Sequence, residues 1–324
     1  MTARLTRRAF AAAALALPVA AQAQGWRPDR PVRFIVPYTA GGASDITARL
    51  IAERLRGPFG QSGVVENRAG ASGIIGTEAV AKAAPDGTTI LMVASSHVVN
   101  RALFPSLPYD PIADFAPITL TAHVQLVLVV PASNPARNVQ ELMAWAKAQN
   151  GRAAFASSGN GSNPHIFAAD LLKRAGVEME HIPYRGSTAA HADLLAGRTQ
   201  MMFDAYAAVA PHVQAGTLRL LALAGPTRSR LLPDLPTVAE QGFPGYGATS
   251  WGCLLAPAGT PPAAIATLNA AARDILTSGE VREKLAVLGA EPSPGTPEEL
   301  LAFMRSEQAR YIQLVRDLGI TASG

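Results

Sequence analysis

The sequence predicts an α/β protein built from two lobes. Short β-rich runs alternate with helical patterns, which is typical of parallel sheets covered by helices. The alternation falls into two series, separated by one long apolar run. With 324 residues, 48% hydrophobic and 16% charged, the chain is long enough and apolar enough for two folded cores.

The first series predicts three strands and two helices. The strands are rich in β-branched residues, and the second helix ends at the breaker Pro85-Asp86-Gly87. We expect strands at 32–38, 64–67 and 88–95, and helices at 45–55 and 73–84.

The apolar run at 118–132 is longer than a typical strand, so we expect it to pass from one sheet to another. A second βα series follows it, and the β-rich run at 218–225 is a natural return crossing. In this series we expect helices at 138–149, 165–176, 189–197 and 208–216, and strands at 153–158, 179–184 and 200–206. The rest of the chain predicts a strand at 249–257 and helices at 262–277, 280–288 and 297–318.

Two crossings divide the chain into two lobes. We expect lobe 1 to combine residues 24–125 and 226–324, and lobe 2 to hold residues 126–225. The cleft between two such lobes is the expected ligand site.

The first 23 residues have the composition of a secretory signal peptide. A basic start is followed by an apolar stretch of about ten residues and by Ala21-Gln22-Ala23, a small-residue cleavage signal. The apolar stretch is only half of the about 20 residues that a membrane-spanning helix needs. We therefore expect export to the periplasm and cleavage after about Ala23. Arg7 and Arg8 leave the general and the twin-arginine export routes both open.

Charge and cysteine content exclude several classes of function. Removal of Arg4, Arg7 and Arg8 with the signal peptide leaves 25 of the 28 basic residues against 24 acidic ones, so the mature chain offers no basic surface for nucleic acid. Cys253 is the single cysteine, which rules out an intrachain disulfide and a cysteine metal cluster. Nothing after residue 23 reaches membrane-spanning length, so we expect a water-soluble mature chain that does not insert into a membrane.

The stretch Pro37 to Asp45 predicts an anion-binding loop. It joins a strand to a helix through small residues, at the edge where open α/β sheets bind ligands. Glycines let the backbone approach a ligand, Ser44 or Asp45 can cap the helix, and the helix N-terminus favours an anion. The candidate binding residues of this loop are Tyr38, Thr39, Ala40, Gly41, Gly42, Ser44 and Asp45.

A matching loop, Ser157 to His165, occurs in the second series. We expect Ser162 to be the N-cap of the next helix, Pro164 to lie in its first turn and Gly176 to end it. The candidate binding residues of this second loop are Ser158, Gly159, Asn160, Gly161, Ser162 and His165. Facing each other, the two loops would hold a carboxylate without any arginine; alternatively, each is glycine-rich only because tight turns need glycine.

Five further residues follow strand ends and are candidate ligand contacts. Ser95 and Ser96 offer hydroxyls, although they could simply cap a helix. Tyr184 and Arg185 follow another strand, and Arg185 could pair with a ligand carboxylate or remain solvated. Asp204 ends an apolar strand, where an acid needs a partner, a ligand amine or a ligand hydroxyl.

An enzyme is the main alternative, namely a hydrolase or isomerase of a small acid that uses Ser162, His165 or Asp204. No nucleophile elbow, dinucleotide-binding fingerprint, phosphate-binding loop or zinc-protease motif supports it. The six histidines are scattered without ligand spacing, so we expect neither a metal nor a cofactor. A transcriptional effector module is disfavoured by the signal peptide and by the lack of a DNA-binding segment.

Long motifs in this chain resemble those of the Bug-type receptors, the extracytoplasmic solute-binding proteins of tripartite tricarboxylate transporters. They read, in order, VPYTAGGASDITARLIAERL, VVENRAGASGIIGTEAVAKAAPDGTTILM, YDPIADFAPIT, YRGSTAAHADLLAGRTQMMFD and SWGCLLAPAGTP. The resemblance runs from about residue 26 to the C-terminal helix.

The resemblance implies a type II periplasmic-binding-protein fold that closes on a small carboxylate, directly or through ordered waters. It also implies a non-catalytic receptor that hands its ligand to membrane permease subunits, and we expect a monomer. The family positions for ligand contacts coincide with the two loops and with Ser95, Ser96, Tyr184, Arg185 and Asp204. Ala40, Ala69 and Ser72 depart from the family pattern, which could alter the ligand accepted but not the class.

Overall fold

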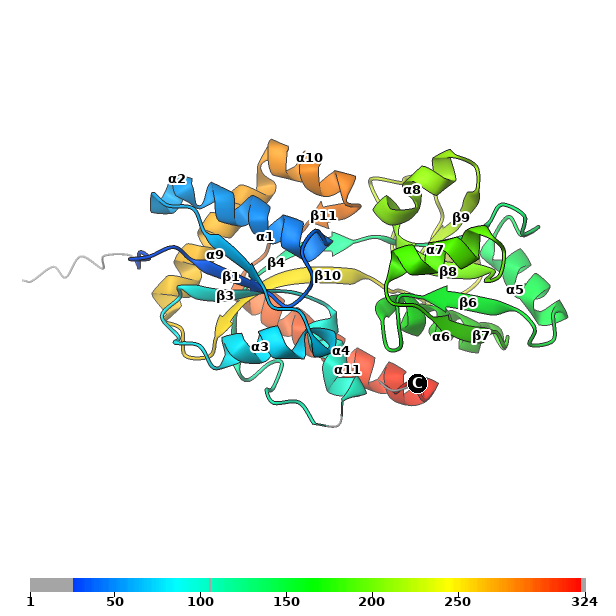
Figure 1. The fold of residues 1–324 in the computed structure, drawn as a ribbon, viewed down its shortest axis with the longest axis horizontal. Helices are drawn as coiled ribbons and strands as arrows, with labels where there is room; N and C mark the ends of the chain where they lie inside the picture. Colours follow the sequence, from blue (N-terminus) through cyan, green and yellow to red (C-terminus); the bar gives the residue numbers. More distant parts are fainter. Residues whose placement is uncertain (1–25, 105, 322–324) are drawn as a thin grey trace, which may run out of the picture.

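The computed structural model describes residues 26–104 and 106–321, so the signal-peptide prediction lies outside the described residues. Two sheets lie side by side as two lobes, each covered by helices (Figure 1). Lobe 1 has a six-stranded sheet in the order β11-β4-β10-β3-β1-β2, and lobe 2 has a five-stranded sheet in the order β7-β6-β8-β5-β9. The predicted two-lobed α/β fold is therefore confirmed.

Lobe 1 is built from both ends of the described chain. Its strands are β1 (Arg33–Val36), β2 (Val64–Asn67), β3 (Thr89–Ala94), β4 (Phe115–Val124), β10 (Ser250–Pro257) and β11 (Ala290–Pro292). Its helices are α1 (Ala43–Arg54), α2 (Arg56–Phe59), the 3-10 turn η1 (Ala71–Gly73), α3 (Ile74–Ala81), α4 (Ser96–Leu103), α9 (Pro262–Thr277), α10 (Gly279–Val287) and α11 (Pro297–Leu318).

Lobe 2 is formed by the middle of the chain. Its strands are β5 (Leu126–Pro131), β6 (Ala154–Ser157), β7 (Glu180–Pro183), β8 (Met201–Ala205) and β9 (Leu218–Leu223). Its helices are α5 (Val139–Ala148), α6 (Asn163–Ala175), α7 (Ser187–Leu195) and α8 (Tyr206–Gln214), and the 3-10 turn η2 (Ala239–Gln241) lies on the way back to lobe 1.

The two sheets share one pattern. In lobe 1, β1 pairs in parallel with β2 and β3, and in lobe 2, β6 pairs in parallel with β7 and β8. Each parallel trio is extended by an antiparallel strand, β10 beside β3 and β5 beside β8. The loop after β1 is thus the counterpart of the loop after β6, and the carboxyl ends of both trios carry equivalent loops.

The first crossing lies where the length of the apolar run predicted it. β4 ends at Val124 in one sheet and β5 begins at Leu126 in the other, so Gln125 alone separates them. The return differs from the prediction. The run at 218–225 forms β9 inside lobe 2, and the chain returns through 226–249 before β10 begins. β9 remains in lobe 2 because it pairs with β5 along its length.

Helix α11 connects the two lobes. Thr296 and Glu299 form a reciprocal capping box at its start, and Gly319 in the left-handed region ends it. It packs against α4 and β4 of lobe 1 and against α6 of lobe 2 (Figure 1). One continuous apolar cluster consequently extends through both lobes, including Leu103 of α4, Phe167 of α6 and Val315 of α11.

A buried ion pair anchors α11 to the segment that returns from lobe 2. Glu307 is 8% exposed and accepts hydrogen bonds from Trp251 Nε1 at 3.0 Å and from Arg310 Nε at 2.8 Å. Arg310 also donates to the carbonyl oxygen of Gly247 at 3.4 Å. The helix and the start of β10 are therefore held together by one carboxylate.

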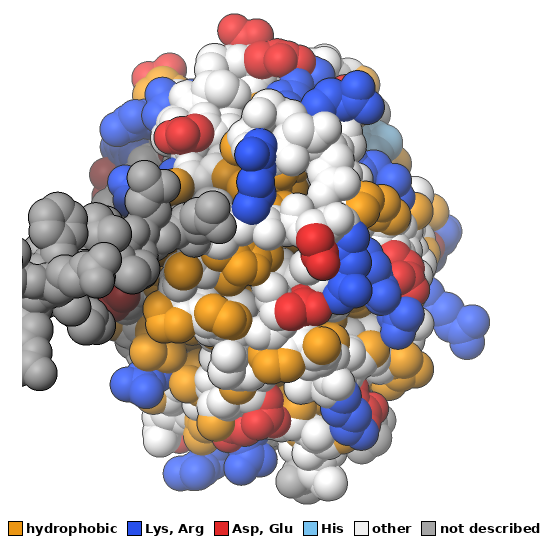
Figure 2. Space-filling model, turned by 90° about the vertical axis from the view of Figure 1, so that its left-hand side faces the viewer, with side chains coloured by type: hydrophobic (Ala, Val, Ile, Leu, Met, Phe, Trp, Pro, Cys, Tyr) orange, Lys and Arg blue, Asp and Glu red, His pale blue; other side chains and the backbone are white. Residues whose placement is uncertain are grey.

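Outside the cleft, the surface of lobe 1 mixes both charges. Figure 2 shows acidic and basic side chains interspersed with hydrophobic ones on the face of lobe 1 that points away from lobe 2. This mixture of acidic and basic side chains is consistent with the nearly equal numbers of acidic and basic residues after residue 23.

We predict that Glu307→Ala lowers the free energy of unfolding by about 2 to 3 kcal/mol, because Trp251 and Arg310 would lose a charged acceptor. Chemical denaturation followed by circular dichroism measures this loss. Arg305→Ala, an exposed change on the same helix, is the control and should stay within about 0.5 kcal/mol of the parent. Equal effects of the two substitutions would contradict the anchoring role of Glu307.

Candidate functional site

The loops at the carboxyl ends of the two parallel trios meet between the lobes. The side-chain amide of Asn163, at the start of α6, donates to Ser95 Oγ at the end of β3 over 2.7 Å. The backbone of Gly161 lies so close to Leu103 that an added Cβ would come within 2.5 Å of it. The loop after β6 therefore contacts the end of β3 and helix α4, and the first part of the loop after β1 lines the same cleft.

Helix α1 follows the loop that lines this cleft and begins with amides that no side chain caps. Gly42 is its N-cap and provides no side-chain cap, so the N–H groups of Ala43, Ser44 and Asp45 have no acceptor within the helix. The expectation that Ser44 or Asp45 caps the helix is wrong, because the N-cap is Gly42, two residues before Ser44 and three before Asp45.

Asp45 instead holds the first loop in shape. It is 3% exposed, and its carboxylate accepts hydrogen bonds from Gly41 N at 2.9 Å, Arg49 Nε at 3.0 Å and Asn67 Nδ2 at 2.9 Å. Burial alone would raise the pKa of Asp45, but the hydrogen bonds from Arg49, Gly41 and Asn67 outweigh it and lower the pKa. The carboxylate is saturated by the protein and positions the loop.

The second loop matches the prediction in its capping. Ser162 accepts the N–H of His165 at 3.4 Å, Pro164 lies in the first turn of α6, and Gly176 ends the helix in the left-handed region. Gly161, with φ +68°, donates its N–H to His165 Nδ1 at 3.1 Å. His165 therefore orders the loop through the backbone.

Two stacked imidazoles lie under the second loop. The rings of His165 and His181 are 3.7 Å apart, and Phe155 stacks on His181 at 4.9 Å. His181 Nε2 lies 2.7 Å from Ser157 Oγ, which accepts the N–H of Gly159. Burial lowers the pKa of both histidines to about 4, and for His165 the neighbouring His181 adds to the effect. Both rings are neutral near pH 7.

A third group of predicted residues surrounds the start of α7. Its N-cap is Gly186, with φ +101° and no side-chain cap. Asp204 is 4% exposed and accepts hydrogen bonds from Ser187 Oγ at 2.8 Å and His191 Nε2 at 2.7 Å. Asp204 thus has the partners that its position in an apolar strand required. It fixes the first turn of α7, while the amides that begin this helix remain without intrahelical acceptors.

Tyr184 and Arg185 differ in their contacts. The Tyr184 hydroxyl donates to Asp193 of α7, and its backbone oxygen lies next to Gly159 of the second loop. Arg185 is exposed. Tyr184 therefore supports the junction of two loops, and Arg185 lies at the surface.

A cavity of about 550 Å³ occupies the cleft between the lobes. It is lined from lobe 1 by the loop after β1, by η1 and by α4, and from lobe 2 by the loop after β6. The lining residues are Pro37, Tyr38, Thr39, Ala69, Gly70, Ser72, Gly73, Ser96, Asn100, Leu103, Phe104, Ser158, Gly159, Asn160, Gly161 and Ser162. None of these residues is charged.

The predicted site residues divide accordingly. The cavity is lined by Tyr38, Thr39, Ser96, Ser158, Gly159, Asn160, Gly161 and Ser162. The others lie beside or behind these residues and do not line this cavity; they are Ala40, Gly41, Gly42, Ser44, Asp45, Ser95, His165, Tyr184, Arg185 and Asp204. Eight lining residues were not among the candidates. Asn100, Leu103 and Phe104 lie on or directly after α4, a helix that was not expected, and the others are Pro37, Ala69, Gly70, Ser72 and Gly73.

Tyr38 and Ser96 form the polar corner of this cavity. The Tyr38 hydroxyl lies 2.7 Å from Ser96 Oγ and accepts the N–H of Ala94 at 3.1 Å. Burial raises the pKa of Tyr38 to about 12, so its hydroxyl stays protonated. The corner can therefore offer a hydroxyl hydrogen bond to a ligand.

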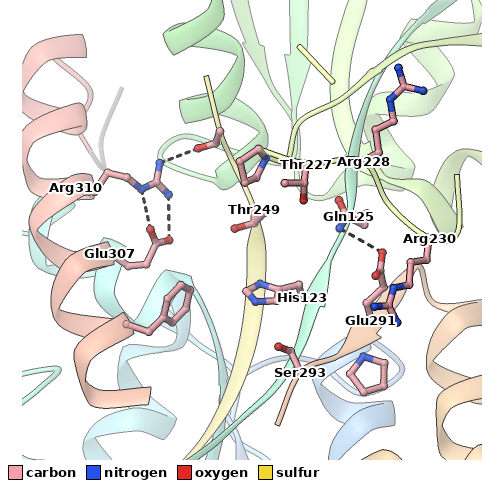
Figure 3. A pocket seen from close by; sticks show the side chains of 14 residues that line it. His123, Gln125, Thr227, Arg228, Arg230, Thr249, Glu291, Ser293, Glu307 and Arg310 are labelled. Atoms are coloured by element: carbon pink, nitrogen blue, oxygen red, sulfur yellow. Dashed lines mark hydrogen bonds and ion pairs between the residues drawn. The ribbon is translucent and has the colours of Figure 1, made fainter. Parts of the chain in front are cut away.

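A second cavity, of about 580 Å³, lies where the connections between the lobes meet. Figure 3 shows His123, Gln125, Thr249 and Glu291 around it, with the Glu307–Arg310 pair at its side. Five charged residues line it, and only Arg310 and Glu307 pair with each other, since Arg228 binds Glu240 outside the cavity and Glu291 accepts from Gln125 and Ser229. This cavity lies at the crossings and away from the loops that carry free helix N-termini.

Two features absent from the described residues bear on other functions. Within 26–104 and 106–321, no group of three or more His, Cys, Asp or Glu side chains is arranged to bind a metal ion. In the same part of the chain, no helix combines the length and the apolar character needed to cross a bilayer.

We predict that acid weakens the fold through the stacked histidines. An unfolded imidazole has a pKa near 6.5, whereas His165 and His181 have folded pKa values of about 4. Between these values the unfolded chain binds more protons, so the free energy of unfolding falls as the pH drops from 6.5 to about 4 and this contribution levels off below it.

Urea unfolding across this pH range tests the prediction with the double variant His165→Gln/His181→Gln, whose stability should depend less on pH than that of the parent. His97, another buried histidine with a pKa lowered by burial to about 4, supplies a remaining slope in both proteins. An unchanged slope in the variant would show that the stack does not remain neutral.

Comparison with known proteins identifies the family. Residues 47–320 match the model of the tripartite tricarboxylate transporter family receptor. Protein BugT of Bordetella pertussis is 39% identical over 96% of this chain and 95% of its own length. The structure of R. palustris Rpa4515 with adipate is 37% identical, with a TM-score of 0.81, covering 91% of this chain and 99% of that one. The periplasmic binding protein BugD is 32% identical with a TM-score of 0.78 over the same shares. The chain therefore belongs to the tripartite tricarboxylate transporter receptor family, whose members are periplasmic solute-binding proteins.

Proposed function

We propose that this protein is a periplasmic receptor that binds a small organic carboxylate between its two lobes and delivers it to the membrane permease of a tripartite tricarboxylate transporter. The observation that carries the proposal is the convergence of helix N-termini and small loops from both lobes on one cleft. Membership of the receptor family and the adipate bound to a relative of 37% identity support the ligand class.

The cleft is suited to an anion although its cavity is lined by no charged residue. The uncapped amides at the starts of α1 and α7 and the dipoles of these helices favour negative charge. Hydroxyls of Tyr38, Ser96 and Ser158 add further polar contacts. On binding, a carboxylate would lose hydrogen bonds to water and gain hydrogen bonds from the N–H and O–H groups of the protein.

Binding by both lobes at once would stabilise the closed arrangement. A ligand shifts the equilibrium only by its difference in affinity between the open and closed states. Contacts from the loop after β1 and from the loop after β6 exist together only when the lobes are close, as the contact between Asn163 and Ser95 requires. Closure of this kind would present a distinct shape to a permease.

The side chains of the enzyme alternative are engaged in structural contacts. Ser162 caps α6, His165 Nδ1 accepts the N–H of Gly161, and Asp204 accepts from Ser187 and His191. In the last group the carboxylate lies between the serine and the histidine. Because His191 bonds to Asp204 and not to Ser187, it is not placed to take the serine proton. We infer binding without catalysis.

Replacement of Ala43 by proline tests the amide clamp. Ala43 is exposed at the first position of α1, and Gly42 before it is extended, with ψ 168°. Proline is tolerated at this position and removes one N–H. We predict that Ala43→Pro weakens carboxylate binding by about tenfold or more, the effect of one hydrogen bond to a charged group, without loss of stability. Calorimetric titration with adipate and a panel of other organic acids measures it.

Gly279→Pro is the matched control, because Gly279 holds the same first position in α10, away from the cleft, and has open space for a side chain. It should leave affinity unchanged. Amides of the same acids should bind poorly to the parent protein. Equal affinities of the acids and their amides, or equal effects of the two proline variants, would refute a carboxylate clamp at α1.

A further inference from the structure

Part of the lining of the cavity in the cleft is apolar, and this part is called the apolar wall here. Pro37, Ala69, Leu103 and Phe104 line this wall, and the last two end helix α4. Leu103 belongs to the apolar cluster that runs through both lobes, and Phe104 packs against the same cluster. Leu103 and Phe104 are therefore held by the packed interior, whereas Ala69 is exposed.

The wall reaches across to lobe 2. Leu103 is 8% exposed, and its Cδ1 and Cδ2 atoms lie against the backbone of Gly161. A side chain at Gly161 has no room, so the second loop and α4 fit directly together. A ligand held between the two loops would have Leu103 and Phe104 beside its body.

The polar side chain on the same helix as Leu103 already has a partner within the protein. Asn100 Nδ2 donates to the carbonyl oxygen of Ser72 at 3.0 Å. A second carboxylate of the ligand in this part of the cavity would find no cation among the lining residues. Burial of an unpaired charge is unfavourable, whereas burial of an apolar group against Leu103 and Phe104 is favourable.

We propose that Leu103 and Phe104 determine selectivity by accepting the apolar body of the ligand, so that the protein prefers carboxylates whose acid group is followed by an alkyl or aryl portion over short, hydroxylated di- and tricarboxylates. This inference rests on the proposed carboxylate function and adds the chemistry of the rest of the ligand.

The test is a set of dissociation constants for the mature protein with acetate, butanoate, hexanoate, octanoate, benzoate, adipate and malate. Affinity should rise about fourfold per methylene from acetate to hexanoate, the value of one buried CH₂ group, and benzoate should bind more tightly than malate. Affinities that do not depend on chain length, or tightest binding of malate, would overturn the inference.

Phe104→Ala separates a selective from a structural role. It should weaken hexanoate or benzoate about tenfold or more, the effect of losing contact with a large apolar side chain, and leave acetate nearly unchanged. Val287→Ala, an exposed apolar truncation on α10 with Val287 77% exposed, is the control and should change neither. Equal weakening of all acids by Phe104→Ala would show that Phe104 only supports the fold.

Phe104→Arg provides the converse readout. A cation at the apolar wall should improve adipate relative to hexanoate, because the distal carboxylate gains a partner. An unchanged ratio of the two affinities would place the ligand body elsewhere and overturn the inference.

If no acid in the set binds and none of their amides binds either, the proposed carboxylate function is refuted, and this inference is refuted with it. Binding of acids without chain-length dependence refutes the inference alone.

Discussion

The structure depends on backbone amides that lack acceptors at the starts of helices. Both lobes repeat one arrangement, in which three parallel strands run toward the cleft and lead into helices. The first N–H groups of each such helix cannot be satisfied inside the helix. Two of these helix starts, Ser96 of α4 and Ser162 before α6, line the cavity between the lobes, and no charged side chain belongs to that lining. A site made of backbone N–H groups works only if the loops keep a fixed conformation. Residues behind the loops hold that conformation.

Buried polar side chains supply these loop shapes. Asp45 binds Gly41, Asp204 binds Ser187, and His165 binds Gly161, so each loop is held by a group that lies behind it. All three are partly or fully enclosed, which makes their hydrogen bonds persistent and their loss costly. Asp45, His165 and Asp204, which were predicted to contact the ligand, thus do not line the cavity and instead hold the loops in place. The cavity at the crossings has a different character, since charged side chains, among them the Glu307–Arg310 pair, line it (Figure 3).

The sequence specified most of the architecture because its signals were local. The run at 118–132 was too long for one strand. Thr296 and Glu299 at the start of α11 and Gly319 after its end are residues typical of helix termini. Helix α4 was missed, since the segment Ser96–Leu103 is short, contains the β-branched pair Val98-Val99 and is soon followed by prolines; in the fold it packs against α11. Leu103 and Phe104 were missed with it. The sequence could locate strand ends, and hence the two loops, but it could not tell which side chains face the cavity, because that depends on how the lobes meet.

The most direct test of the two-lobed clamp is amide hydrogen exchange on the mature protein with and without the tightest-binding acid. The account predicts that exchange slows together at residues 42–45 of lobe 1 and at residues 159–162 and 186–189 of lobe 2, since one ligand contacts both lobes. Residues 226–230 and 289–293, around the cavity at the crossings, should change less. Protection confined to one lobe, or greatest at the crossings, would contradict the account.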